Sequence, residues 1–344
     1  MKLISQLTWA STSMVTAQTA WACATCGCAL SSEAAMGYST GPGWLLSAEF
    51  DYLNQDQLRH GSGPISQAQV AALNPAANQE VENDTINRYT TLGAAYSPNS
   101  SWNFRVLLPY IDRSHSTYGG ASNPLTPEQL SNANVTGLGD IKLISSYQGF
   151  LPTRNLGLQL GFKLPTGHYG GPNASGTGIV GSNPVSFDNH GNSAGQLLDT
   201  SLQAGNGSTD VILGAYYFQA VSQDFDAFVN GQFQTSIAQK LNQPGADFRP
   251  GNSANVSLGL RYEADPHFVP QLQLNLTHKT ADQGALADMA DTAGTVAYLS
   301  PGLTASVTHN THVYAFVQLP IHSQLQGYQL FPHWTATVGV TVGF

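Results

Sequence analysis

The chain has 344 residues and a formal net charge of −9, and only 10% of its residues are charged, far below the ~25% typical of soluble globular proteins. The acidic balance and the absence of any Lys/Arg run argue against a nucleic-acid partner. No apolar run reaches the ~18 residues that an ordinary transmembrane helix needs. An aromatic content of 10% argues against a disordered chain.

The first residues resemble an export signal. Lys2 is followed by a modestly apolar stretch over 3–17 and by a small-x-small cleavage motif at 20–22. We therefore predict a signal peptide over 1–22 and a mature chain that begins at Cys23. Export would place the protein outside the bacterial cytoplasm.

Three cysteines follow at once, Cys23, Cys26 and Cys28, in the string "CATCGC". No histidine follows the CxxC, which excludes the usual c-type haem attachment. One interpretation is a disulfide or an inert tether with one thiol left over. The other is a copper or zinc site that engages a periplasmic metal or redox protein. A lipidated first cysteine is disfavoured because Ala20 stands where Leu is preferred. We predict a periplasmic segment over 23–42 and no other cofactor.

From residue 43 onward, apolar residues recur at every second position. Trp44, Leu46 and Phe50 form one face of the first such segment, and Glu49 and Asp51 lie on the other face. Further alternating segments lie near 92–96, 102–110, 140–147, 156–164, 209–220, 225–236, 254–263, 269–279, 294–305, 312–320 and 333–344. No connection between them has a helical period. The pattern predicts about twelve strands and an all-β fold.

The connections between these segments alternate between long and short. The long ones are 55–81, 112–136, 166–207, 238–252, 280–293 and 321–332, and the short ones are 97–101, 149–154, 221–224, 263–267 and 307–310. Short periplasmic turns and long extracellular loops are typical of an outer-membrane barrel. We predict a transmembrane antiparallel up-and-down β-barrel over 43–344, in the outer membrane of a Gram-negative bacterium. A soluble β-sandwich is the alternative if export stops in the periplasm.

Aromatic residues mark the strand ends beside the short turns. They are Trp44, Tyr96, Trp102, Tyr147, Phe225 and Tyr262. Rings at one level around a barrel indicate the girdle that such proteins place at the membrane–water interface. The apolar face of each strand is therefore predicted to contact lipid.

Five strings resemble a bacterial outer-membrane family named for the MetA pathway of phenol degradation. They are "LLPYI" (107–111), "GLGDIKL" (137–143), "LGFKLPTG" (160–167), "GNGSTDVILGAYY" (205–217) and "GYQLFPHWTATVGVTVGF" (327–344). The resemblance implies a barrel with a role in the passage of small organic molecules. The final Phe344 resembles the aromatic residue by which the barrel-assembly machinery recognises its substrates.

The alternation places eight charged residues on the interior face. They are Glu49, Asp51, Arg105, Asp140, Lys142, Lys163, Asp210 and Arg261. Four acidic and four basic groups either pair to brace the interior or set the selectivity for a solute. The neutral polar residues of the interior face are expected to let water wet part of the wall. They are Gln159, Gln271, Gln273, Asn275, Thr277 and the threonines of the last strand.

Five aromatic residues are predicted to share this interior face. They are Tyr216, Phe218, Phe228, Tyr314 and Phe316. They form either a lining for an aromatic or aliphatic solute or a plug, since apolar constrictions gate by dewetting.

Motifs for chemistry are lacking in the sequence. No GxSxG, HExxH, phosphate-loop or dinucleotide fingerprint occurs, so we predict no enzyme. Seven of the ten histidines lie in or beside the long connections, without ligand spacing, and are predicted to be solvated: His60, His115, His168, His190, His278, His322 and His333. The predicted function is a channel or transporter for passive passage of small, apolar or aromatic organic solutes. The alternative is an accessory barrel whose cysteines bind metal or a redox partner.

Overall fold

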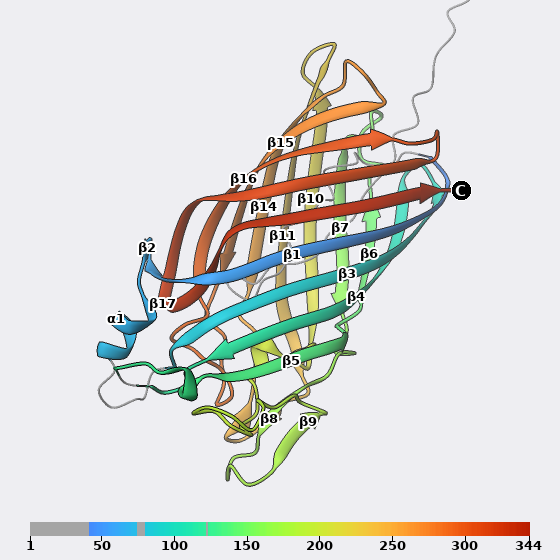
Figure 1. Cartoon of the computed structure of the whole chain (residues 1–344). Coiled ribbons are helices and arrows are strands. Elements are labelled where there is room, and N and C mark those ends of the chain that lie inside the picture. The colour runs from blue at the N-terminus through green and yellow to red at the C-terminus, as the bar shows by residue number, and fades with distance from the viewer. Residues whose placement is uncertain (1–40, 74–79, 122) are drawn as a thin grey trace, which may run out of the picture.

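A computed structural model describes residues 41–73, 80–121 and 123–344 of the chain, and these residues form a closed antiparallel β-barrel (Figure 1). The predicted signal peptide and the three cysteines lie outside the described residues. The wall strands are β1 (Gly43–Gly61), β3 (Glu82–Asn99), β4 (Trp102–Thr117), β6 (Lys142–Tyr147), β7 (Leu156–Lys163), β10 (Ser208–Ala220), β11 (Phe225–Gln239), β14 (Ser253–Tyr262), β15 (Phe268–Lys279), β16 (Gly294–Ser306) and β17 (Thr311–Gly343). Each pairs with its neighbour along this path, and β17 closes the barrel on β1.

Eleven labelled strands therefore make the wall of the described chain, against about twelve predicted. The difference lies in β17, which contains the last two predicted strands. Its first part pairs with β16 as far as Leu325, and its second part pairs with β1 from Leu325 onward. Between them Gly327 has a φ of 65°, a conformation that glycine adopts without steric cost. A single element thus supplies two passes of the wall.

The strands run further toward the long-loop end than the alternation predicts. β1 continues to Gly61 and β4 to Thr117, inside stretches predicted to be loops. These extensions carry polar residues on both faces. A backbone ladder needs no apolar face, so periodicity marks only the part of a strand with one apolar side.

Smaller elements gather at the long-loop end. They are β2 (Gly63–Pro64), α1 (Gln67–Ala72), η2 (Pro127–Gln129), β5 (Ser131–Leu138), β8 (Tyr169–Pro172), β9 (Ile179–Ser182), η3 (Thr200–Leu202), β12 (Asn242–Gln243) and β13 (Ala246–Asp247). The sequence did not predict α1, which begins with a capping box between Ser66 and Gln69. Among the described residues, no helix has the length and apolar character needed to cross a membrane.

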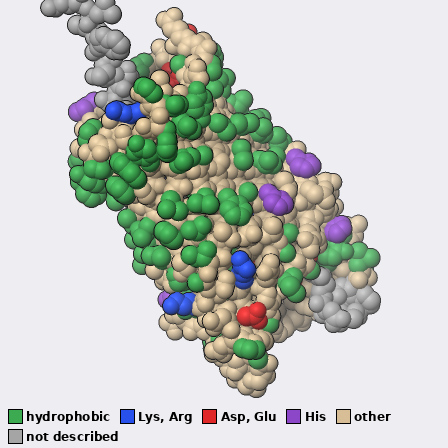
Figure 2. Space-filling view, turned by 180° about the vertical axis from the view of Figure 1, so that it is seen from behind, with side chains coloured by type: hydrophobic (Ala, Val, Ile, Leu, Met, Phe, Trp, Pro, Cys, Tyr) green, Lys and Arg blue, Asp and Glu red, His purple; other side chains and the backbone are tan. Residues whose placement is uncertain are grey.

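The outer face of the barrel is apolar and the interior face is polar. In β1, Trp44 is 53% exposed on the outer face, whereas Asp51 on the interior face is 0% exposed. Figure 2 shows hydrophobic side chains spread over this side of the barrel, with the few charged side chains toward its two ends. The predicted direction of the alternation is therefore confirmed.

The rings predicted to form a girdle lie at the short-turn end and contact one another in pairs. The ring centroids of Trp44 and Tyr96 are 4.8 Å apart, and those of Trp102 and Tyr147 are 4.7 Å apart. The pair of Phe225 with Tyr262 is at 5.0 Å. In each pair the two rings come from strands that are hydrogen-bonded neighbours in the wall, and they lie at the level of the short turns.

An apolar cluster lies at the long-loop end of the barrel, which we call the mouth. Leu198 and Leu202 of the connection between β7 and β10 pack against Ala133 and Val135 of β5. β5 pairs with the far part of β4, while β6 pairs with its near part. The longest connection thus folds onto the wall.

Candidate functional site

All eight predicted interior charges lie on the interior face of the barrel. Six of them are buried, and Lys142 and Arg261 are partly buried. These charges form two groups. The mouth group is Lys163 with Asp140 and Asp210, and the other group lies nearer the short-turn end. Their contact with a solute stays a prediction.

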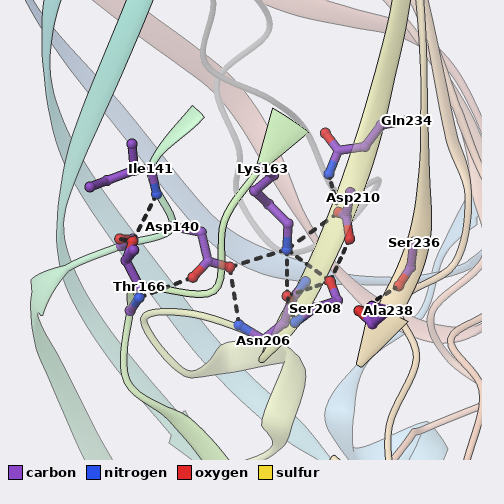
Figure 3. Close-up of polar contacts among 12 residues, drawn as sticks. Asp140, Ile141, Lys163, Thr166, Asn206, Ser208, Asp210, Gln234, Ser236 and Ala238 are labelled. Carbon is purple, nitrogen blue, oxygen red and sulfur yellow. Dashed lines mark hydrogen bonds and ion pairs between the residues drawn. The ribbon is translucent and has the colours of Figure 1, made fainter. Parts of the chain in front are cut away.

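Lys163, at the end of β7, forms the centre of the mouth group (Figure 3). Its Nζ lies 3.1 Å from Asp140 Oδ2 and 3.3 Å from Asp210 Oδ2. The same Nζ donates to Ser208 Oγ at 2.9 Å and to Asn206 Oδ1. A buried ammonium is thus fully surrounded by acceptors, which compensates its loss of hydration.

The same group fixes both ends of the long connection between β7 and β10. Asp140 Oδ1 accepts a hydrogen bond from Gly167 N at 3.0 Å, and its Oδ2 accepts one from Asn206 N at 3.3 Å. Asp210 Oδ1 accepts from Ser208 Oγ at 2.5 Å. These contacts favour bracing as the role of Lys163, Asp140 and Asp210.

The other interior charges also have close partners. Arg261 lies 3.0 Å from Glu263, and Lys279, which the sequence did not single out, lies 2.7 Å from Asp282. Asp51 Oδ1 accepts a hydrogen bond from Thr337 Oγ1 at 2.6 Å. The interior therefore presents ion pairs more than isolated charges.

The predicted interior rings lie against the wall. A Cβ added at Gly157 would be 2.0 Å from the ring of Tyr216, and one added at Gly259 would be 2.1 Å from Phe228. Gly302 and Gly339 are covered in the same way by Phe316 and Tyr314, at 2.1 Å and 2.2 Å. Phe218 is partly buried and pairs with Phe228. Rings seated over glycines line the wall, which favours the lining interpretation over the plug.

Both tyrosines reach across the glycine strand to a polar group beyond it. Tyr216 Oη, from β10, crosses β7 and donates to Gln148 Oε1 at 2.9 Å. Tyr314 Oη donates to Glu49 Oε2 of β1 at 2.6 Å. A ring with a hydroxyl thereby satisfies a buried acceptor while it covers the wall.

Neutral amides fill the middle of the interior face. Gln232 Nε2 donates to Gln159 Oε1 at 2.5 Å, and Asn275 Nδ2 donates to Ser300 Oγ at 2.8 Å. Gln273, in the same layer, is 2% exposed. The layer is polar but uncharged.

Arg113 is a structural residue that the sequence analysis missed. It lies on the extension of β4, in a stretch predicted to be a loop. Its Nε donates to Asn87 Oδ1 at 2.6 Å, its Nη2 to Tyr89 Oη at 2.6 Å, and its Nη1 to Leu202 O. Arg113 therefore ties the apolar cluster of the mouth to two wall strands. The residues around Arg113 are polar on both faces of the strand, so the sequence lacked the apolar alternation that would have predicted a strand there.

The prediction that His115 is a solvated loop histidine is also wrong, because this residue is buried in β4. It is 2% exposed, and its Nδ1 lies 2.7 Å from Thr85 Oγ1. Burial, with a smaller effect of the Arg113 charge, lowers the pKa of His115 to about 3. The imidazole is neutral at pH 7 and packs as part of the wall.

Carboxylates line a cavity of about 40 Å³ in the mouth. They are Glu80, Glu82, Asp199, Asp288 and Asp291. Burial raises the pKa of Glu82 well above its ordinary value, and the charge of Glu80 adds to the shift. In the described part of the chain, no three His, Cys, Asp or Glu side chains are placed to hold a metal ion.

No family model matches this sequence, and no curated protein matches it. Among solved structures, the COG4313 outer membrane channel from Pseudomonas putida F1 is similar, with 13% identity over 88% of this chain and 96% of that chain and a TM-score of 0.61. The β domain of the Bordetella autotransporter BrkA (12% identity, 88% and 100% covered, TM-score 0.47) and the CymD monoaromatic hydrocarbon channel (12%, 88% and 89%, 0.43) are more distant. At 13% identity, the likeness to the COG4313 channel shows the barrel fold.

Proposed function

We propose that this chain is an outer-membrane channel for the passive passage of small organic solutes. The observation that carries the proposal is a closed barrel with an apolar outer face and a polar interior. Such a wall satisfies its backbone hydrogen bonds internally and buries its apolar face in hydrocarbon. The fold it shares with an outer membrane channel supports the same function.

The proposal includes an orientation. The short turns and both ends of the wall face the periplasm, and the mouth faces outward, as is usual for outer-membrane barrels. Lipid contacts the outer face. Phe344, 73% exposed at the short-turn end, is proposed as the signal read by the barrel-assembly machinery. A lower surface level of a Phe344→Ala chain, at unchanged synthesis, would support this role.

The paired charges and the aromatic rings of the interior favour the passage of organic solutes over the passage of inorganic ions. Ion pairs neutralise the charges at Lys163, Arg261 and Lys279. Rings at Phe228 and Phe316 provide apolar contact for an aromatic or aliphatic body. The solutes proposed are therefore small, with an apolar or aromatic part.

The test uses the folded full-length barrel in detergent and then in liposomes. An unboiled sample should migrate faster on a gel than a boiled one, because a closed barrel resists unfolding. Liposomes containing the barrel should swell in small neutral organic solutes faster than liposomes containing heat-unfolded protein. Extraction without detergent and identical mobility before and after boiling would contradict a membrane barrel. Folded barrel without any swelling would contradict a channel.

A further inference from the structure

Four interior rings share one arrangement, but only two of them carry a hydroxyl. Tyr216 crosses Gly157 and donates to Gln148 on the far side. Phe228 of β11 covers its register partner Gly259 of β14, and Gly259 pairs in turn with Gln273 of β15. Gln273 therefore stands where Gln148 stands for Tyr216, but the ring that reaches toward it has no hydroxyl.

Gln273 and two neighbours carry buried polar atoms that no described residue satisfies. Gln273 Nε2, Asn275 Oδ1 and Asn230 Oδ1 make no hydrogen bond within the described chain. The three residues are 2%, 2% and 4% exposed. One donor and two acceptors are thus held together on the interior face without a partner from the described protein, which leaves them available to another polar group.

The three atoms belong to one place on the wall. Asn230 of β11 and Asn275 of β15 pair with the same residue, Ser257 of β14, from its two sides. Gln273 precedes Asn275 by two residues on β15, so both lie on the same face. Gln273 pairs with Gly259, the glycine that Phe228 covers. We call Asn230, Gln273 and Asn275 the amide station.

The chemistry of the amide station selects for a neutral solute with a hydrogen-bonding group. Amides offer a donor and acceptors but no charge, and the nearest cation in register, Arg261, is paired with Glu263 at 3.0 Å. A pure hydrocarbon would leave the three atoms unsatisfied, and an ion would find no counter-charge. A hydroxyl or amide group satisfies them, while the ring of Phe228 covers the apolar part of the solute.

We propose that the amide station is the specificity-determining site of the channel and that it binds the hydroxyl or amide group of small uncharged solutes. This proposal rests on the proposed channel function and narrows its solutes. Phe228→Tyr supplies the missing hydroxyl from the protein itself, as Tyr216 does for Gln148. The added hydroxyl satisfies Gln273 and thereby occupies the station.

The experiment compares swelling of liposomes in xylitol, gluconate and lysine. Wild-type barrel should admit xylitol at least fivefold faster than either ion. Phe228→Tyr should lower the xylitol rate at least threefold, and Gln273→Leu, which deletes the donor, should do the same. Phe233→Tyr is the matched control, because Phe233 lies on the outer face of the same strand and is 40% exposed.

The outcomes separate this proposal from the channel itself. Gel mobility must first show equal folded fractions for all four proteins. Wild-type passage of xylitol with unchanged rates in both interior variants would overturn the amide station and leave the channel intact. Faster passage of gluconate or lysine than of xylitol would overturn neutral selection. Folded wild-type barrel that admits no solute would overturn the channel, and the station with it.

Discussion

The barrel has two halves that are held together by different means. In the short-turn half, rings seated over glycines and neutral amides cover the interior, and the outer face is apolar. In the mouth half, the strands continue with polar faces, and the ion pairs of Lys163 and the hydrogen bonds of Arg113 hold a long connection against the wall. The short-turn half also holds charges such as Glu49 and Arg261, but it depends mainly on steric fit, whereas the mouth half depends mainly on charged side chains.

This difference follows from the surroundings of each half. Where the outer face is apolar, register and steric fit determine the interior, because each inward residue is set by its strand partners. Where loops enter the barrel, their backbone groups need partners that no ladder supplies. Side chains such as Asp140 and Arg113 provide these partners. Substitutions in the two halves should therefore fail in different ways.

The largest effect is expected in the mouth, from Lys163→Met. Loss of the ammonium leaves Asp140 and Asp210 buried without their shared cation, a change that typically costs about 3–5 kcal/mol. The connection over 164–207 should become sensitive to protease, while the unboiled barrel should keep the faster gel mobility of the folded protein. Urea unfolding and limited proteolysis measure the two effects.

Lys240→Met is the control for that prediction, because Lys240 is exposed. Adding Asp140→Asn to Lys163→Met should restore part of the lost stability, since it removes one of the two uncompensated charges. Equal protease resistance in Lys163→Met and the wild type would show that ionic contacts do not hold the mouth.

A smaller effect is expected in the short-turn half, from Gly157→Val. The new side chain overlaps the ring of Tyr216, which must leave the wall and give up its hydrogen bond to Gln148. Overpacking of this kind costs roughly 1–3 kcal/mol. The free energy of unfolding in urea measures the loss.

Gly231→Val is the matched control in the short-turn half. The nearest atom to a Cβ at Gly231 is 3.9 Å away, so the control should unfold like the wild type. If the two glycine variants are equally stable, the contact of interior rings with wall glycines does not contribute to the stability of the short-turn half.

The smallest effect is expected from pH at the mouth. The folded state raises the pKa of Glu82, so it binds this proton more tightly than the unfolded chain does. The mouth should be most stable below the ordinary pKa of 4.5 and should lose stability as pH rises through the raised value. Amide exchange over 199–202, corrected for the intrinsic rate, should be a few-fold slower near pH 4.5 than at pH 7.5.

Glu82→Gln should remove most of this pH dependence while keeping an oxygen that accepts from Leu330 N. The carboxylates of Glu80, Asp199, Asp288 and Asp291 also line the cavity and account for the remainder. Unchanged pH dependence in this variant would assign the effect to those groups.

The comparison of the halves also explains what the sequence could predict. Alternation over 44–52 predicts the outward Trp44 and the inward Asp51 correctly, because the environment of each face repeats with the period of the strand. The same reasoning places Arg113 and His115 in a loop, since the extension of β4 that carries them has no apolar face to mark it. The seating of Tyr216 over Gly157 is invisible in the sequence, because it depends on register between strands.

The seam between β1 and β17 has a consequence for how the barrel assembles. It joins Leu45 to Gly343, which are 343 − 45 = 298 positions apart, and each of its pairs is a contact of very high sequence separation. Contacts of this kind form late and slowly, because the chain entropy of closure is lost before they stabilise anything. Until the last strand is in place, both edges of the sheet remain open templates for other chains. The interval before closure is therefore the stage at which this protein is most exposed to aggregation.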